Sequence, residues 1–282
     1  MSDDPITPEE VFALLGNETR IDIIRVLGLM AGESLSFSEL HDQVAVRDSG
    51  QFNYHLNRLV GTFVRRTGEG TYELTFAGSR VVGAIYSGEF EHGETQGSIR
   101  LDSQCGNCGA QLTATYGDET VAINCTRCEE IDSTFGFPSG GVEGRSEDEL
   151  TRVFDRWLRS IFALIGDGIC HNCTGTMERW MSDDSKHLHP DDPVNITFAC
   201  ERCGDEATLS ITSFLYLQRE VVGFYFSNGV DLHAVDMWNA RTFLDPTVTV
   251  VSEQPWEVAA EFEHAGERLD LTVHDDLSIT VK

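Results

Sequence analysis

The stretch SGQFNYHLNRLV, residues 49–60, decides how the N-terminal part of the chain is interpreted. Its apolar side chains recur at i, i+4, i+7 and i+8, the spacing of one buried helix face. They are Phe52, Leu56, Leu59 and Val60. The opposite face carries amides, a phenol and a guanidinium group, on Gln51, Asn53, Tyr54, Asn57 and Arg58. Because amides pair bidentately with adenine and arginine with guanine in the major groove, this face is predicted to read DNA bases.

Helices are expected on both sides of this stretch. One is predicted over residues 8–15, a second from a cap at Asn17, and a third from a cap at Ser36 with Glu39 at the capping-box position. Ser49 is expected to cap the quoted helix. The following segment, FVRRTGEGTYELT, alternates apolar and polar residues around the turn 68–70, which predicts a hairpin. A fifth helix over residues 76–87 completes the winged helix-turn-helix order.

Three motifs carry a resemblance to a known family. LLGNETRIDIIRVL, FSELHDQV and the quoted helix resemble the ArsR-type winged-helix regulators of archaea and bacteria, over about residues 8–88. The resemblance implies sequence-specific DNA binding, usually as a dimer. It places the reading helix at residues 49–59, where His55, Leu56 and Leu59 match a His-Leu-x-x-Leu pattern. It places the wing near residues 65–72, so Arg65 and Arg66 are expected close to the phosphate backbone.

The chain departs from this family in one respect. The winged-helix fold is also compatible with a function other than DNA binding. Metal-sensing members carry a cysteine pair in the third helix, where this chain has SELHDQV, so no metal sensing is expected there. Winged helices also serve as scaffolds or protein-interaction modules. The alternative function is therefore a transcription-associated adaptor that docks proteins and does not read DNA.

The formal net charge of −27 sets the conditions under which DNA could be bound. Of 20 basic residues only Lys186 and Lys282 are lysines, against 47 Asp and Glu, a balance that indicates a protein adapted to a high-salt cytoplasm. Residues 47–66 nevertheless hold four arginines and one aspartate, Asp48. No secretory signal and no membrane-spanning run is found, which predicts a soluble cytoplasmic protein with no membrane partner.

All eight cysteines fall in four CxxC pairs, which predict two structural zinc sites. The ligands are Cys105, Cys108, Cys125, Cys128, Cys170, Cys173, Cys200 and Cys203. The first two pairs have zinc-ribbon spacing, and the second two are separated by an insertion at 182–193 that is expected to be a polar loop. CGNCG and CHNCT, followed by INCTRCEE and FACERCGDE, suggest an internal repeat. Which pairs share an ion stays open, since crossed pairing is compatible with the sequence.

Other uses of these cysteines are less favoured than zinc. Disulfides do not suit a reducing cytoplasm, no thioredoxin-like context surrounds a CxxC pair, and the hairpin-like spacing is unlike that of iron–sulfur ligands. His171, His187 and His189 are expected to be bystanders. Four thiolates leave no open coordination position, and no catalytic motif was found elsewhere. The chain is therefore not expected to be an enzyme.

The remaining segments predict an α+β protein. An amphipathic helix is expected over residues 146–165, with Asp155 and Arg159 on its polar side, either as core or as a dimer seam. A helix over 212–226, a short helix within 230–243 and an antiparallel meander after Pro246 should follow. This last region could sense an unknown small-molecule effector or mediate homodimerisation. The cysteine-rich region also resembles the C-terminal part of ArsR-like regulators from halophilic archaea.

The predicted organisation has five parts. A winged helix-turn-helix DNA-binding domain occupies residues 1–92, the first zinc ribbon 93–140 and a connecting helix 141–168. The second zinc ribbon occupies 169–212, and helices with a small antiparallel sheet occupy 213–282. The predicted function is a DNA-binding transcriptional regulator that acts on double-stranded DNA as a homodimer.

Overall fold

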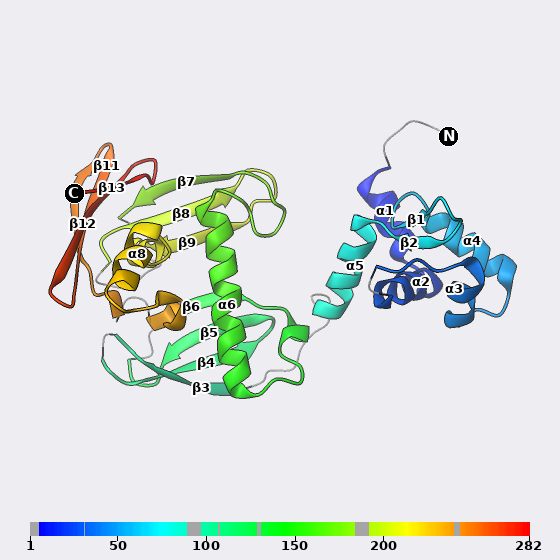
Figure 1. Cartoon of the computed structure of the whole chain (residues 1–282), viewed down its shortest axis with the longest axis horizontal. Helices are drawn as coiled ribbons and strands as arrows, with labels where there is room; N and C mark the ends of the chain where they lie inside the picture. Colours follow the sequence, from blue (N-terminus) through cyan, green and yellow to red (C-terminus); the bar gives the residue numbers. More distant parts are fainter. Residues whose placement is uncertain are drawn as a thin grey trace. The chain divides into compact units, whose positions relative to one another are not determined.

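The computed structural model describes residues 6–30, 32–88, 97–106, 108–128, 131–183, 192–239 and 243–282. The chain divides into two compact units, each with its own hydrophobic core. Residues 1–92 with 138–140 form the first unit, and residues 93–137 with 141–282 form the second. The described residues form four antiparallel sheets, which together with the helices confirm a mixed α+β fold (Figure 1).

The first unit consists of helices and one hairpin. Its elements are α1 (Pro8–Leu15), α2 (Glu18–Leu29), α3 (Phe37–Gln43), α4 (Ser49–Leu59), β1 (Val64–Arg66), β2 (Tyr72–Leu74) and α5 (Phe76–Ser87). The helices and hairpin predicted from the sequence are confirmed. Leu35 pairs with Tyr72 through two backbone hydrogen bonds, of 2.9 and 2.7 Å, and so ties the start of α3 to the hairpin.

Local capping explains where most of these helices begin. Ser36 and Glu39 form the predicted capping box, and Asn17 caps α2. The predicted cap of α4 is wrong: Asp48, not Ser49, is the N-cap. Its backbone is extended, and its carboxylate accepts a 2.6 Å hydrogen bond from the Gln51 N–H. A carboxylate here also interacts favourably with the helix dipole, which gives Asp48 an advantage over a neutral hydroxyl.

The core of the first unit fixes the orientation of α4. Phe52, Leu56 and Leu59 are fully buried, against Ile23 and Ile24 of α2 and other apolar residues of the same cluster. The apolar face predicted for α4 therefore holds for these three residues. Val60, the fourth predicted member, is 37% exposed, because the helix ends at Leu59 and Val60 already has extended backbone.

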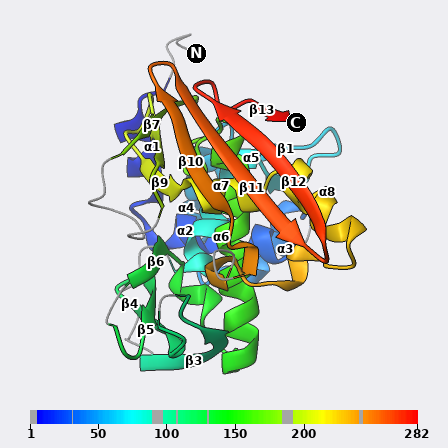
Figure 2. The same cartoon turned by 90° about the vertical axis from the view of Figure 1, so that its left-hand side faces the viewer.

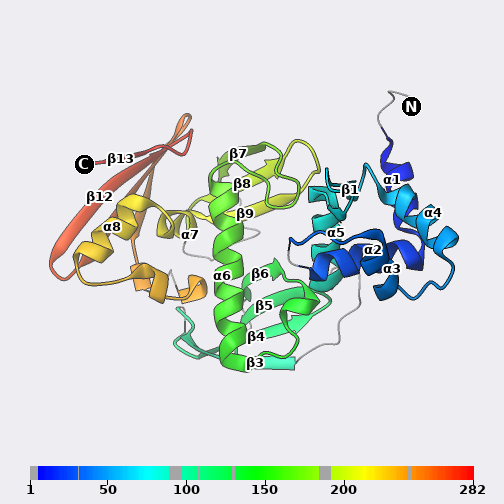
Figure 3. The ribbon, with the colours of Figure 1, turned by 45° about the vertical axis from the view of Figure 1, so that its right-hand side comes forward.

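The second unit contains three sheets and a long central helix. Its first two sheets are β3 (Gly97–Gln104), β4 (Gln111–Gly117), β5 (Thr120–Cys125) and β6 (Ile131–Gly136), followed by β7 (Met177–Ser182), β8 (Asn195–Cys200) and β9 (Glu206–Ser210). Between them runs α6 (Glu147–Gly166), which lies along both sheets (Figures 1 and 3). Phe137 packs edge-on against Phe154 and Trp157 of α6, which joins the helix to the first sheet.

The polar side of α6 differs from the prediction. Asp155 and Arg159 are both buried and form a 2.7 Å ion pair. Arg159 Nη2 also donates to the Tyr216 hydroxyl at 3.0 Å, and Asp155 accepts from the Met237 N–H at 2.8 Å. The partners come from 57 and 82 residues further along the chain, so a helical pattern alone cannot reveal that they cover this face.

The region after β9 is more divided than predicted. Instead of one helix over 212–226, α7 (Ile211–Tyr216) and α8 (Arg219–Ser227) are separated at Gln218, whose backbone is extended. Instead of one short helix within 230–243, two 3₁₀ turns form, η3 (Leu232–Ala234) and η4 (Met237–Asn239); residues 240–242 lie outside the described residues.

The predicted C-terminal meander is confirmed. Its strands are β10 (Thr247–Glu253), β11 (Trp256–His264), β12 (Glu267–His274) and β13 (Ile279–Val281), paired in chain order (Figure 2). Val258, Ala260 and Phe262 of β11 are buried, and Phe262 meets Tyr225 of α8 edge-on, with ring centroids 6.4 Å apart. Helix α8 therefore covers the inner face of this sheet. Within the described parts of the chain, no helix combines the length and apolarity needed to span a membrane.

Candidate metal centres and nucleic-acid interface

The first four-cysteine cluster lies at the turn ends of the β3–β6 sheet. Cys105 and Cys108 lie between β3 and β4, and Cys125 and Cys128 lie at the end of β5. Neighbouring sulfurs are 3.4 Å apart for Cys108 and Cys125 and 3.6 Å apart for Cys105 and Cys128. Cys105 and Gly109 form a tight backbone turn, in which Gly109 has a φ of 67° that glycine adopts without steric cost.

The second cluster repeats this arrangement around β8. Cys170 and Cys173 precede β7, and Cys200 and Cys203 lie at the end of β8. The sulfurs of Cys173 and Cys200 are 3.5 Å apart, and those of Cys170 and Cys203 are 3.7 Å apart. The cysteines therefore group by sequence proximity, and the crossed pairing left open by the sequence is not found. Most of the insertion at 182–193, with His187 and His189, lies outside the described residues.

Both clusters have the dimensions of a tetrahedral thiolate site. In each cluster the four sulfurs lie within 4.8 Å of one another, so each could hold a metal ion. Four sulfurs at 2.3 Å from a tetrahedral zinc would be about 3.8 Å apart. A disulfide would need a distance of about 2 Å, which none of the sulfur–sulfur distances given above approaches. Four thiolates around one ion leave no position for water, which suits a role in folding and not in catalysis.

Backbone N–H groups lower the pKa of one thiol in each cluster. Burial alone would raise the pKa of Cys125, but the N–H groups of Cys128 and Arg127 lower it to about 6. The pKa of Cys200 is also lowered to about 6, mainly by the N–H of Cys203 and, against burial, by that of Arg202. The backbone hydrogen bond from Asp205 would lower the pKa of Cys203, but the neighbouring thiols, that of Cys173 first, and burial outweigh it and raise this pKa to about 12. The thiolate is the form that binds a metal, so the turns favour the binding form at Cys125 and Cys200.

Sequence reasoning missed Asp205 as a neighbour of the second cluster. Its carboxylate lies 3.6 Å from Cys170 Sγ and 3.2 Å from His171 Nδ1. His171 thus contacts Asp205 and lies beside the group of four cysteines. The signal was present in the sequence, because Asp205 follows Cys203 by two residues in the CERCGD segment. Only the folded turn shows that the carboxylate points back to the cluster.

The candidate nucleic-acid interface is the exposed side of α4 and β1. The seven residues predicted to contact DNA are all exposed: Gln51, Asn53, Tyr54, Asn57, Arg58, Arg65 and Arg66. Five of them lie on α4, opposite its buried Phe52, Leu56 and Leu59. His55 is buried on the core side, and burial followed by the charge of Arg20 lowers its pKa, so it is a neutral packing residue near pH 7.

Two of the three carboxylates near this interface are already engaged, whereas Glu69, in the hairpin turn, is exposed. Asp48 caps α4 through the Gln51 N–H, and Glu73 forms a 2.8 Å ion pair with Arg65. The Arg65 side chain is 63% exposed, so this pair contributes little to stability and could exchange for a phosphate contact. Arg66 lies over the Tyr72 ring, at 5.8 Å from its centroid. Arg58 and Arg66 have no carboxylate partner among the described residues.

The two units together define a protein with paired four-thiol centres in one unit and a polar helix face exposed on the other. The chain belongs to a family whose domain is described as a domain of unknown function, DUF7351, which matches residues 102–279. A second domain of unknown function, DUF7347, matches residues 8–85. No curated protein and no solved structure matches the chain.

Proposed function

We propose that the protein is a sequence-specific DNA-binding transcriptional regulator of the ArsR-like winged helix-turn-helix type, adapted to a salty cytoplasm. The observation that carries this proposal is the two-sided character of α4. Its apolar side is fully buried, whereas Gln51, Asn53, Asn57 and Arg58 are exposed and project from one short helix. Amides and arginines suit base edges in the major groove, and β1 would place Arg65 and Arg66 next to the backbone.

High salt resolves the conflict between DNA binding and the charge of −27. At about 1 M salt the Debye length is about 3 Å, so the carboxylates of the chain repel a phosphate only at close range. The gain from counterion release is also small under these conditions. Affinity then depends on direct base contacts and on water-mediated fit, which is what an amide-rich reading face supplies.

The test compares specific with nonspecific binding. A site selected from random DNA is titrated with wild-type protein and with Asn53→Ala and Arg58→Ala, at constant high salt. Each substitution should weaken specific binding by about 1–3 kcal/mol and leave nonspecific binding nearly unchanged. Arg80→Ala, an exposed arginine of α5 outside the proposed surface, is the matched control. Equal losses on both kinds of DNA would show that α4 does not read bases.

We propose zinc as the ion of both clusters and a structural role for it. All-cysteine shells with sulfur–sulfur distances of 3.4–3.7 Å suit tetrahedral zinc, and such a shell has no catalytic position. The protein is accordingly proposed not to be an enzyme. Elemental analysis of purified protein should give two zinc ions per chain. One ion per chain, or iron in place of zinc, would contradict the assignment.

A homodimer is proposed through the aromatic side chains that the first unit exposes. Phe12 of α1 is 71% exposed and Phe76 of α5 is 84% exposed, and exposed aromatics are enriched where proteins meet. Light scattering should report a dimer for the wild type and a shift toward monomer for Phe12→Ser with Phe76→Ser. Phe226→Ser, at 70% exposure on α8, is the control for loss of an aromatic elsewhere.

The same exposed aromatics favour one alternative function, a protein-interaction adaptor of the transcription machinery. An adaptor would use Phe12 and Phe76 to bind a different protein and would have no preferred DNA sequence. The two functions separate cleanly, since an adaptor yields no DNA motif at any salt concentration.

A further inference from the structure

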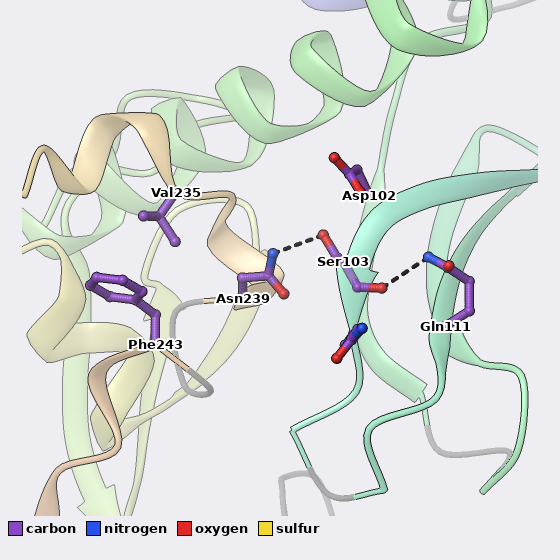
Figure 4. A pocket seen from close by; sticks show the side chains of 7 residues that line it. Asp102, Ser103, Gln111, Val235, Asn239 and Phe243 are labelled. Carbon is purple, nitrogen blue, oxygen red and sulfur yellow. Dashed lines mark hydrogen bonds between the residues drawn. The ribbon is translucent and has the colours of Figure 1, made fainter.

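A cavity of about 380 Å³ that is open to solvent lies in the second unit, between the first sheet and the 3₁₀ turns (Figure 4). Asp102, Ser103 and Gln104 at the end of β3 line one side. Val235, Asn239 and Phe243 line the other. The volume is at the lower end of the range of small-molecule sites, which fits a compact ligand.

The polar groups on the cavity wall are held in place. Ser103 is 5% exposed, and its hydroxyl accepts hydrogen bonds from Trp238 Nε1 at 3.1 Å and Asn239 Nδ2 at 2.8 Å. The Asn239 amide is thereby fixed with its nitrogen on Ser103, which leaves its oxygen as an acceptor. Ser103 itself donates toward Asp236 at 3.5 Å, so its hydroxyl has no capacity left for a ligand.

The groups that remain available are mainly acceptors. In the described part of the chain, no hydrogen bond or ion pair engages the side chains of Asp102 and Gln104. The Gln111 amide, also on the wall, is used by the backbone of Ser103 and by Arg100. The described lining residues include no arginine, lysine or histidine, and Asp236 adds negative charge behind Ser103. An anion would therefore find no counter-charge on the described wall.

Apolar surface complements these acceptors. Phe243 and Val235 face the cavity from the side opposite Asp102 and Ser103 (Figure 4). Both side chains can cover the short hydrocarbon stem of a ligand whose charged group lies on the acceptors. A bare metal ion would use the carboxylate but would gain nothing from this apolar side.

We propose that this cavity binds a small organic cation, an ammonium or guanidinium group on a short apolar stem. The charged group donates to Asp102 and to the amide oxygens of Gln104 and Asn239, and the stem packs on Phe243 and Val235. This site is separate from DNA reading. It would supply the small-molecule effector site of the proposed regulator, but its occupancy does not depend on DNA binding.

The wall of the cavity is connected to the core of the unit. The Val235 carbonyl accepts hydrogen bonds from Arg159 of α6 and from the Tyr216 hydroxyl. A ligand that contacts Val235 and Asn239 would therefore stabilise the segment that closes over α6. Trp238, which donates to Ser103 on the wall, provides a fluorescence signal beside the site.

The test uses full-length protein without DNA, at constant KCl. Benzylamine, butylamine and butylguanidine are the cationic probes; benzyl alcohol and benzoate are the neutral and anionic counterparts. Calorimetry and tryptophan-monitored melting should both detect the cations and neither counterpart. Asp102→Asn should raise the dissociation constant at least about tenfold, as expected for the loss of a charged hydrogen-bond partner. Glu178→Gln, an exposed carboxylate of β7, should leave it unchanged.

Three results would overturn the proposal. The first is equal binding of benzyl alcohol and benzylamine, and the second is an unchanged dissociation constant in Asp102→Asn. The third is that no cationic probe binds at a concentration of about 10 mM, since a specific site of this size should bind with a lower dissociation constant than that. A failure of DNA binding would leave these measurements unaffected, so the two proposals are tested separately.

Discussion

Removal of the Asp155 carboxylate should destabilise the second unit strongly. Asp155→Ala leaves the buried Arg159 guanidinium without its hydrogen-bonded carboxylate partner and the Met237 N–H without its acceptor. The side chains of Arg159 and Asp155 are only 9% and 6% exposed, so water cannot replace the lost partner. Breaking a buried pair in this way costs about 3–5 kcal/mol. Because Arg159 keeps the Tyr216 hydroxyl as an acceptor, we expect about 3 kcal/mol.

Tryptophan fluorescence measures this effect selectively. All four tryptophans, Trp157, Trp180, Trp238 and Trp256, belong to the second unit. Urea unfolding at fixed KCl should therefore give the free energy of unfolding of that unit alone, provided that the transition is two-state.

Two further variants show whether the buried charge is the cause. Asp148→Ala, on the exposed first turn of the same helix, should cost at most about 1 kcal/mol. Asp155→Leu with Arg159→Met removes both charges and should recover most of the loss. The reasoning is refuted if Asp155→Ala and Asp148→Ala are equally stable, or if the double variant is less stable than Asp155→Ala.

Three other perturbations have defined outcomes. A Cβ on Gly78 would lie 2.2 Å from the Phe63 carbonyl oxygen, so Gly78→Ala should destabilise the first unit by about 3 kcal/mol. Gly83 lies in open space on the same helix, so Gly83→Ala should stabilise the unit by about 0.5–1 kcal/mol. Native-state hydrogen exchange measures both changes. Thr174 has a φ of 58° where the first cluster has Gly109, so Thr174→Gly should slow metal loss to a chelator and Gly109→Thr should accelerate it. Burial, and then the charge of Asp155, raises the pKa of Asp236 above its ordinary 3.8, so its ionised form destabilises the fold. Asp236→Asn should be more stable than wild type near pH 7, and this advantage should shrink as pH falls through the raised pKa; a constant difference across pH would contradict it.

The sequence predicted the helices, turns and strands that depend on residues close together in the chain. The capping boxes at Ser36 and Ser146 lie where the sequence placed them, because each depends on residues three positions apart. The four CxxC pairs predicted the two cysteine clusters, since a short turn alone brings each pair together. The alternation after Pro246 predicted the meander strands for the same reason.

Features that depend on distant partners were not predictable from one sequence. Asp155 and Arg159 look like polar surface until Tyr216 and Met237 cover them. The cavity joins Ser103 to Asn239 across 136 residues, and no local pattern marks either residue. The cap of α4, by contrast, is a local choice between neighbouring residues: Asp48 accepts from the Gln51 N–H, and its charge also interacts favourably with the helix dipole.

The central claim is that the exposed face of α4 reads DNA sequence in spite of the acidic body of the protein. Selection from random double-stranded DNA, carried out in about 2 M KCl where long-range repulsion is screened, tests it most directly. We predict one enriched motif for the wild type and for Arg80→Ala, and its loss or broadening for Asn53→Ala and Arg58→Ala. No motif at any salt concentration, or the same motif from all four proteins, would contradict the claim.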